Sequence, residues 1–90
     1  MATFMIERTV PGASELTADQ LREISCGSNK VVEGLGVAYT WKHSYVAGDK
    51  IYCVHEASSP EVVLRHAREG GFPANKVTEV AAFIGPATAG

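Results

Sequence analysis

The stretch VAYTWKHSYVAGDKIYCVHEA, residues 37–57, decides how this chain folds. Strand-forming residues stand on either side of an Ala-Gly-Asp sequence at residues 47–49, and Gly-Asp is typical of a turn. The pattern therefore predicts a β-hairpin with strands at residues 37–46 and 50–57. The same stretch holds two of the three histidines, one of the two cysteines and the only tryptophan, so candidate chemistry is concentrated here as well.

Sequence signals for two helices flank the hairpin. Thr17 with Gln20 three residues later has the pattern of a capping box, which starts a helix. Ser59 followed by Pro60 is typical of a helix N-cap and first turn. Apolar residues at strand spacing predict one further strand at each end of the chain. The expected elements are strands at residues 2–10, 37–46, 50–57 and 77–84, and helices at residues 18–33 and 60–69.

The element order βαββαβ predicts an α+β, ferredoxin-like fold, in which a four-stranded antiparallel sheet carries two helices on one face. Right-handed crossovers give the strand order 4-1-3-2. We expect residues 1–85 to form a single domain and residues 86–90 a flexible tail. The other sheet face is left bare, which favours a homodimer resembling a dimeric α/β barrel. The expected contact residues include some of Tyr39, Trp41, His43 and Tyr45.

Composition and charge narrow the functional classes. The chain has 90 residues, of which 46% are hydrophobic, and a formal net charge of −2. This charge gives no electrostatic reason to expect a nucleic acid or an anionic membrane as partner. No secretory signal or membrane-spanning apolar run is visible in the sequence. We expect Cys26 and Cys53 to be reduced thiols in a cytoplasmic protein.

Four stretches of the sequence resemble a family of small ferredoxin-like proteins that are nickel-binding or nickel-responsive, also described as a domain of unknown function. They are WKHSYVAGDKIYCVHEA at residues 41–57, RHAREGGFP at 65–73, IERTVPG at 6–12 and KVTEV at 76–80. The resemblance covers nearly the whole chain and implies a cytoplasmic homodimer that binds Ni²⁺, with no established enzymatic activity. One departure is His55, which stands where the family usually has Tyr and adds either a ligand or another aromatic packing group.

The resemblance makes His43, Cys53 and His66 the main candidate metal ligands, because they coincide with motif positions of that family. Imidazole suits nickel, copper, zinc and iron, and a thiolate adds softness. Taken alone, each has a simpler explanation: a packed strand histidine, a small buried hydrophobe, and a cation at a helix C-terminus. The expected metal is Ni²⁺, with copper, zinc or cobalt as alternatives. Secondary candidates, for ligation or a supporting hydrogen bond, are Glu56, His55 and Glu7.

The hairpin register decides which candidates share a face of the sheet. A two-residue turn pairs His43 with Val54 and places it on the face of Glu56. A three-residue loop pairs His43 with Cys53 and places it beside His55 as well. The two arrangements differ by one residue, and the sequence leaves both open.

Three functions are compatible with these patterns. The first is a cytoplasmic protein that stores, buffers or senses nickel. The second is a small dimeric α/β-barrel enzyme, similar to cofactor-free monooxygenases or isomerases, with His43 or His66 as a base in a pocket on the bare face. The third is a plain interaction module whose histidines only pack. The chain lacks a Ser/His/Asp or Gly-rich phosphate signature, which argues against the enzyme.

Overall fold

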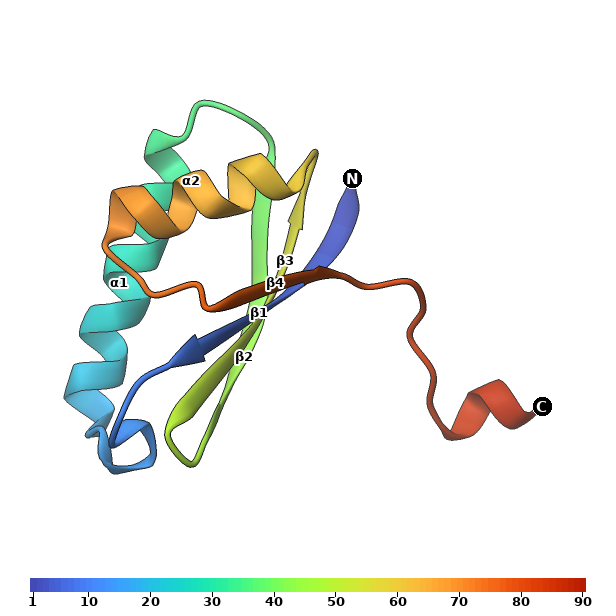
Figure 1. Ribbon diagram of the computed structural model, residues 1–90, viewed down its shortest axis with the longest axis horizontal. Coiled ribbons are helices and arrows are strands. Elements are labelled where there is room, and N and C mark those ends of the chain that lie inside the picture. The colour runs from blue at the N-terminus through green and yellow to red at the C-terminus, as the bar shows by residue number, and fades with distance from the viewer.

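The structure is a computed structural model that describes residues 1–90 (Figure 1). Its elements follow the predicted order βαββαβ, with two additional short 3-10 helices. The strands are β1 (Ala2–Thr9), β2 (Tyr39–Ala47), β3 (Lys50–Ala57) and β4 (Lys76–Glu79). The helices are α1 (Ala18–Gly34) and α2 (Pro60–Gly70), and the 3-10 helices are η1 (Ala13–Glu15) and η2 (Pro86–Ala89).

The four strands form one antiparallel sheet in the order β2-β3-β1-β4. Both helices lie on the same side of this sheet (Figure 1). The predicted α+β, ferredoxin-like fold and its strand order are therefore confirmed. We call the side of the sheet under α1 and α2 the helix-covered face, and the opposite side the open face.

The helix boundaries follow from local chemistry. The Thr17 hydroxyl accepts a hydrogen bond from the Gln20 backbone N–H at 3.2 Å, and the Gln20 side chain accepts one from the Thr17 N–H at 2.9 Å. This confirms the predicted capping box at the start of α1. Helix α2 runs from Pro60 to Gly70, and its C-cap residue Gly71 has a φ of 69°, in the left-handed region that glycine adopts without strain.

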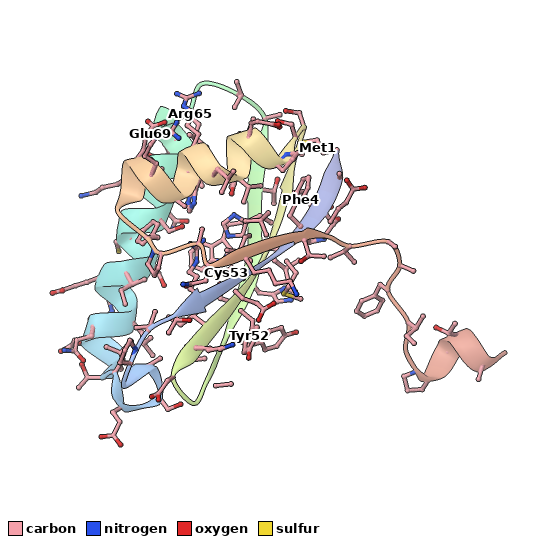
Figure 2. All side chains as sticks on the ribbon, viewed as in Figure 1. Met1, Phe4, Tyr52, Cys53, Arg65 and Glu69 are labelled. Carbon is pink, nitrogen blue, oxygen red and sulfur yellow. The ribbon has the colours of Figure 1, made fainter.

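The core lies between the sheet and the helices. Along β1, Phe4, Ile6 and Arg8 are buried, whereas Met5 and Glu7 are half-buried on the open face. The same alternation on β3 turns Cys53 toward the helices and Tyr52 away from them (Figure 2). The buried hydrophobic cluster consists of Phe4, Ile6, Ala13, Leu35, Tyr39, Ile51, Cys53, Ala57 and Val63.

The hairpin between β2 and β3 has the two-residue turn. Tyr45 pairs with Tyr52 and His43 with Val54, and Gly48 turns the chain with a φ of 61°. A register shift between Trp41 and His43 marks a β-bulge. The bulge puts these two side chains on opposite faces although they are two residues apart in sequence.

The bulge determines which of the four candidate side chains lie on the open face. Tyr39 is buried in the core, and Trp41 pairs with His55 and lines the cavity under the helices. Both aromatic side chains therefore belong to the helix-covered face. Of the aromatic and histidine side chains expected on the bare face, His43 and Tyr45 lie there.

Strand β4 is shorter than predicted. The prediction was residues 77–84, but β4 pairs with β1 only through Phe4 to Glu7 and ends at Glu79. Val80 adds one more backbone hydrogen bond, to Thr3, and the chain then leaves the sheet (Figure 1). Beyond that point Phe83 is 94% exposed. The apolar sequence after Glu79 thus has strand character but no partner strand to pair with.

Neither helix is both long and apolar enough to cross a membrane.

Candidate functional site

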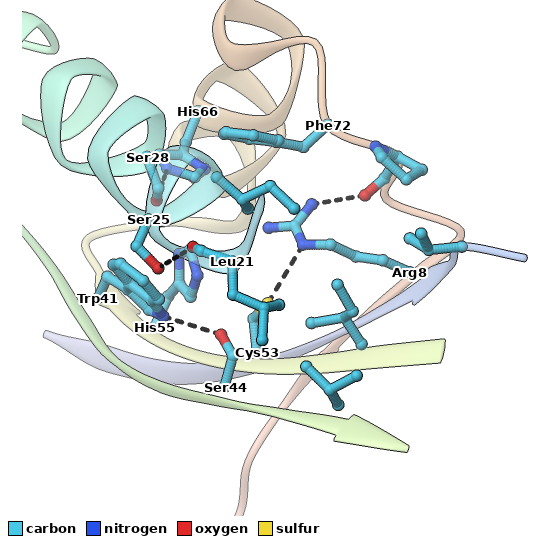
Figure 3. Close-up of a pocket in the computed structure, with 15 residues that line it drawn as sticks. Arg8, Leu21, Ser25, Ser28, Trp41, Ser44, Cys53, His55, His66 and Phe72 are labelled. Atoms are coloured by element: carbon cyan, nitrogen blue, oxygen red, sulfur yellow. Dashed lines mark hydrogen bonds between the residues drawn. The ribbon is translucent and has the colours of Figure 1, made fainter. Parts of the chain in front are cut away.

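A cavity of about 380 Å³ lies between the sheet and the helices (Figure 3). We call it the helix-side pocket. Its walls are mostly apolar, and the polar side chains that line it include Arg8, Cys53, His55, His66 and three serines. The volume is within the range of small-molecule sites in proteins.

Two histidines from different elements meet in this pocket. His55 lies two residues after Cys53 on β3, so both point to the helix-covered face. His66 lies three residues after Val63 on α2, on the side of the helix that faces the sheet. Each histidine is only 1% exposed, and the centroids of the two imidazole rings are 5.0 Å apart.

Each imidazole is held by one of its nitrogens. His55 Nδ1 shares a hydrogen bond with the Tyr39 hydroxyl, and His66 Nε2 shares one of 3.1 Å with the Ser28 hydroxyl. The Tyr39 ring also stacks on His66 at a centroid distance of 5.2 Å. His66 Nδ1 is the one buried side-chain polar atom in the protein without a hydrogen-bond partner. Such an atom in a native structure requires an explanation.

Burial keeps both imidazoles neutral. Loss of solvent, together with smaller contributions from the neighbouring His66 and Arg8 charges, lowers the pKa of His55 from its ordinary 6.5 to about 3. Burial and the Arg8 charge lower the pKa of His66 to about 4. Burial also raises the pKa of the Tyr39 hydroxyl, which therefore stays protonated. At neutral pH the pocket thus holds two uncharged imidazoles.

Arg8 supplies the only full positive charge in the pocket. It is 5% exposed; its Nε donates to Cys53 Sγ at 3.2 Å, and its Nη1 donates to the Pro73 carbonyl oxygen. The Phe72 ring covers the guanidinium, with a distance of 5.6 Å from Cζ to the ring centroid. Figure 3 shows Arg8 reaching into the pocket toward Cys53.

The structure divides the predicted ligands between the two faces. Cys53, His55 and His66 line the helix-side pocket, whereas His43 lies exposed on the open face. The expected set of His43, Cys53 and His66 is therefore not assembled within one chain, because the two-residue turn pairs His43 with Val54 and so directs it away from the helices. No group of three or more His, Cys, Asp or Glu side chains is arranged to hold a metal ion.

The two carboxylate candidates are on the open face and have partners. Glu56 lies 3.9 Å from the ammonium of Lys42, and Glu7 lies 3.7 Å from that of Lys50. Both pairs are partly exposed, so they contribute little to stability. These contacts reduce the negative charge that the open face offers to a cation.

Sequence reasoning missed three residues that shape the pocket: Arg8, Tyr39 as a partner of His55, and Ser28 as a partner of His66. A signal for Arg8 was present, because it continues the alternation of Phe4 and Ile6 that predicts a buried face. The contacts of Tyr39 and Ser28 depend on how the helices sit on the sheet, and no sequence pattern marks them.

Two comparisons with known proteins gave a match. The profile of the family described as nickel responsive protein SCO4226-like matches residues 4–80. The crystal structure of SCO4226 from Streptomyces coelicolor A3(2) is similar with a TM-score of 0.75 and 26% sequence identity, covering 92% of this chain and 100% of that chain. No curated protein sequence matched. These matches confirm the resemblance seen in the sequence motifs, and the structural match also confirms the fold.

Proposed function

Because this chain belongs to the SCO4226-like family of nickel responsive proteins, we propose that it binds Ni²⁺ in the cytoplasm and thereby stores, buffers or senses the metal. The proposed site is the helix-side pocket, with His55 and His66 as ligands and Cys53 as the third donor. Imidazole and thiolate suit nickel, copper and zinc alike, so the preference for nickel rests on the family.

The observation that carries this proposal is the free Nδ1 of His66. When His66 Nε2–H donates to the Ser28 hydroxyl, Nδ1 presents a buried lone pair with no partner in the protein. When His55 Nδ1–H donates to the Tyr39 oxygen, Nε2 of that ring is likewise free. Metal-binding histidines are typically oriented in this way, by a hydrogen bond at the nitrogen that does not bind the metal.

The charges of the pocket also bear on nickel binding. Neutral imidazoles bind a metal ion without first losing a proton. The Arg8 charge opposes a divalent cation, but a thiol that binds a metal loses its proton. A Cys53 thiolate beside Arg8 Nε would cancel that charge. Side-chain rotation is required to bring the three donors onto one ion, with water completing the coordination.

The open face is the weaker alternative as a metal site within one chain. His43 there is exposed and has Tyr45 as its aromatic neighbour at 5.2 Å between ring centroids. The nearby carboxylates are engaged with lysines. In this proposal the open face instead packs against a second copy to form the homodimer, since it exposes Tyr45 and is covered by no helix.

The enzyme alternative is less favoured by the electrostatics of the pocket. A general base works best when its pKa lies near the working pH. The pKa of His66 is about 4, so its imidazole is a weak base at neutral pH. The same neutrality favours metal binding.

Nickel titration of tag-free, metal-depleted protein by isothermal calorimetry tests the proposal. We expect wild type to bind Ni²⁺, and His66→Gln to lose more affinity than the roughly 10- to 100-fold typical of disturbing a supporting hydrogen bond. Gln retains a polar group near Ser28 and similar bulk. His43→Gln, on the open face, is the matched control and should bind as wild type does.

Two outcomes would contradict the proposal. If wild type took up no nickel, nickel binding itself would be refuted. If His43→Gln lost affinity while His66→Gln retained it, the metal site would belong to the open face. Circular dichroism of each variant checks that the fold is intact.

A further inference from the structure

Arg8 is an unusual residue for the middle of a protein. It lies on β1, one of the two central strands, and is 5% exposed. A guanidinium keeps its charge at all accessible pH values, and buried charges in proteins are normally paired with an opposite charge. None of the four ion pairs of this protein includes Arg8. Its hydrogen-bond acceptors are the Cys53 thiol and the Pro73 backbone carbonyl. When the thiol is neutral, neither group carries a negative charge to balance the guanidinium.

Some N–H groups of the guanidinium make no hydrogen bond within the protein. It carries five N–H groups, and the protein uses two of them, one on Nε and one on Nη1. Nη2 makes no hydrogen bond within the protein. Arg8 lines the helix-side pocket, and its guanidinium reaches into it (Figure 3).

Most of the remaining cavity wall is apolar. Its apolar side chains include Val10, Leu21, Ile24, Trp41, Ile51 and Phe72, beside the uncharged histidines and serines described above. A cavity of about 380 Å³ with mostly apolar walls and one cationic group matches a ligand with an apolar body and one negative end. A small hydrophilic anion such as inorganic phosphate would leave most of this wall without contacts.

We propose that the helix-side pocket binds a small organic carboxylate, whose negative end pairs with Arg8 and whose hydrocarbon part contacts the apolar wall. A planar guanidinium is suited to a carboxylate, since two parallel N–H groups can donate to its two oxygens. The carboxylate would supply the countercharge that the protein lacks. This inference does not depend on nickel, because it rests on Arg8 and the cavity.

The test uses metal-depleted protein and pairs of ligands that differ only in charge. The probes are benzoate with benzamide, and hexanoate with hexanamide. The chelator used to remove metal is itself a polycarboxylate, so it must be removed by gel filtration first. Binding is measured by calorimetry, with the shift of the thermal midpoint as a second readout.

We expect at least one carboxylate to bind about 10-fold or more tightly than its amide, as loss of a charged hydrogen-bonding partner implies. Arg8→Met, which keeps an apolar side chain of similar length, should abolish the difference. Arg22→Met is the matched control, because Arg22 is exposed on α1 and pairs with Asp19. It should retain the preference for the carboxylate.

The proposal is overturned if wild type binds neither carboxylate, or binds each carboxylate and its amide equally. It is also overturned if Arg8→Met retains the preference. The first comparison needs no variant, so it decides the question even if Arg8→Met folds poorly. A failure here leaves the nickel titration unaffected, since the two experiments use different ligands and variants.

Discussion

Metal-depleted protein is expected to lose several kcal/mol of stability as the pH falls from about 6.5 to about 4. In the folded protein the pKa values of His55 and His66 are about 3 and about 4, whereas in the unfolded chain both return to about 6.5. At pH values between the folded and unfolded pKa values, the two imidazoles are protonated in the unfolded chain but remain neutral in the folded protein. The stability that the neutral imidazoles contribute is therefore fully present above pH 6.5, and it is lost as the pH falls toward the folded pKa values. Each unit of difference corresponds to about 1.4 kcal/mol, and a domain is typically stable by only about 5–15 kcal/mol.

Urea denaturation at several pH values between 7.5 and 4.5 measures this effect. His66→Gln removes one of the two buried groups, so its stability should depend less steeply on pH than that of wild type. His43→Gln changes an exposed side chain on the open face and should keep the wild-type slope. A stability that stays constant over this range, or an unchanged slope in His66→Gln, would show that the buried imidazoles do not control acid unfolding.

Ile6→Ala is expected to destabilise the protein by about 2–5 kcal/mol, the usual range for removing a large aliphatic side chain from a core. Ile6 is fully buried on β1 and faces the helices. Glu7→Ala, one residue along the same strand, removes only a partly exposed ion pair with Lys50 and should cost less than about 1 kcal/mol. Chemical denaturation of both variants gives the comparison.

This pair of variants tests the assignment of faces on which the division of candidate ligands depends. If Glu7→Ala proved as destabilising as Ile6→Ala, the open face would carry a packed interface as important as the core. If Ile6→Ala were nearly neutral, the helices would not cover that face as described. The second result would require a new account of where the candidate ligands lie.

The fold could be predicted from the sequence because its signals are local. The capping box at Thr17, the Ser59-Pro60 start and the alternation in residues 50–57 each act within a few residues, and all agree on βαββαβ. Strand β4 was overestimated for a reason that is not local. The sequence after Glu79 suits a strand, but β1 offers partners only through Phe4 to Glu7, apart from the added bond to Thr3.

The site could be predicted only in part. The sequence supplied candidate residues, but which of them share a face depends on whether the turn between β2 and β3 has two or three residues, and both registers are compatible with the sequence. Arg8 was missed because charged residues are rarely buried, so the periodicity that marks it carried little weight. The pairing of His66 with Ser28 joins α2 to α1, and such contacts between helices have no signature in either sequence.

The most direct test of the central claim is to locate nickel in a crystal of the nickel-loaded protein by anomalous diffraction at the nickel absorption edge. We predict a peak in the helix-side pocket, within bonding distance of His55 Nε2 and His66 Nδ1. A peak on the open face beside His43, or no peak in nickel-saturated crystals, would contradict the account.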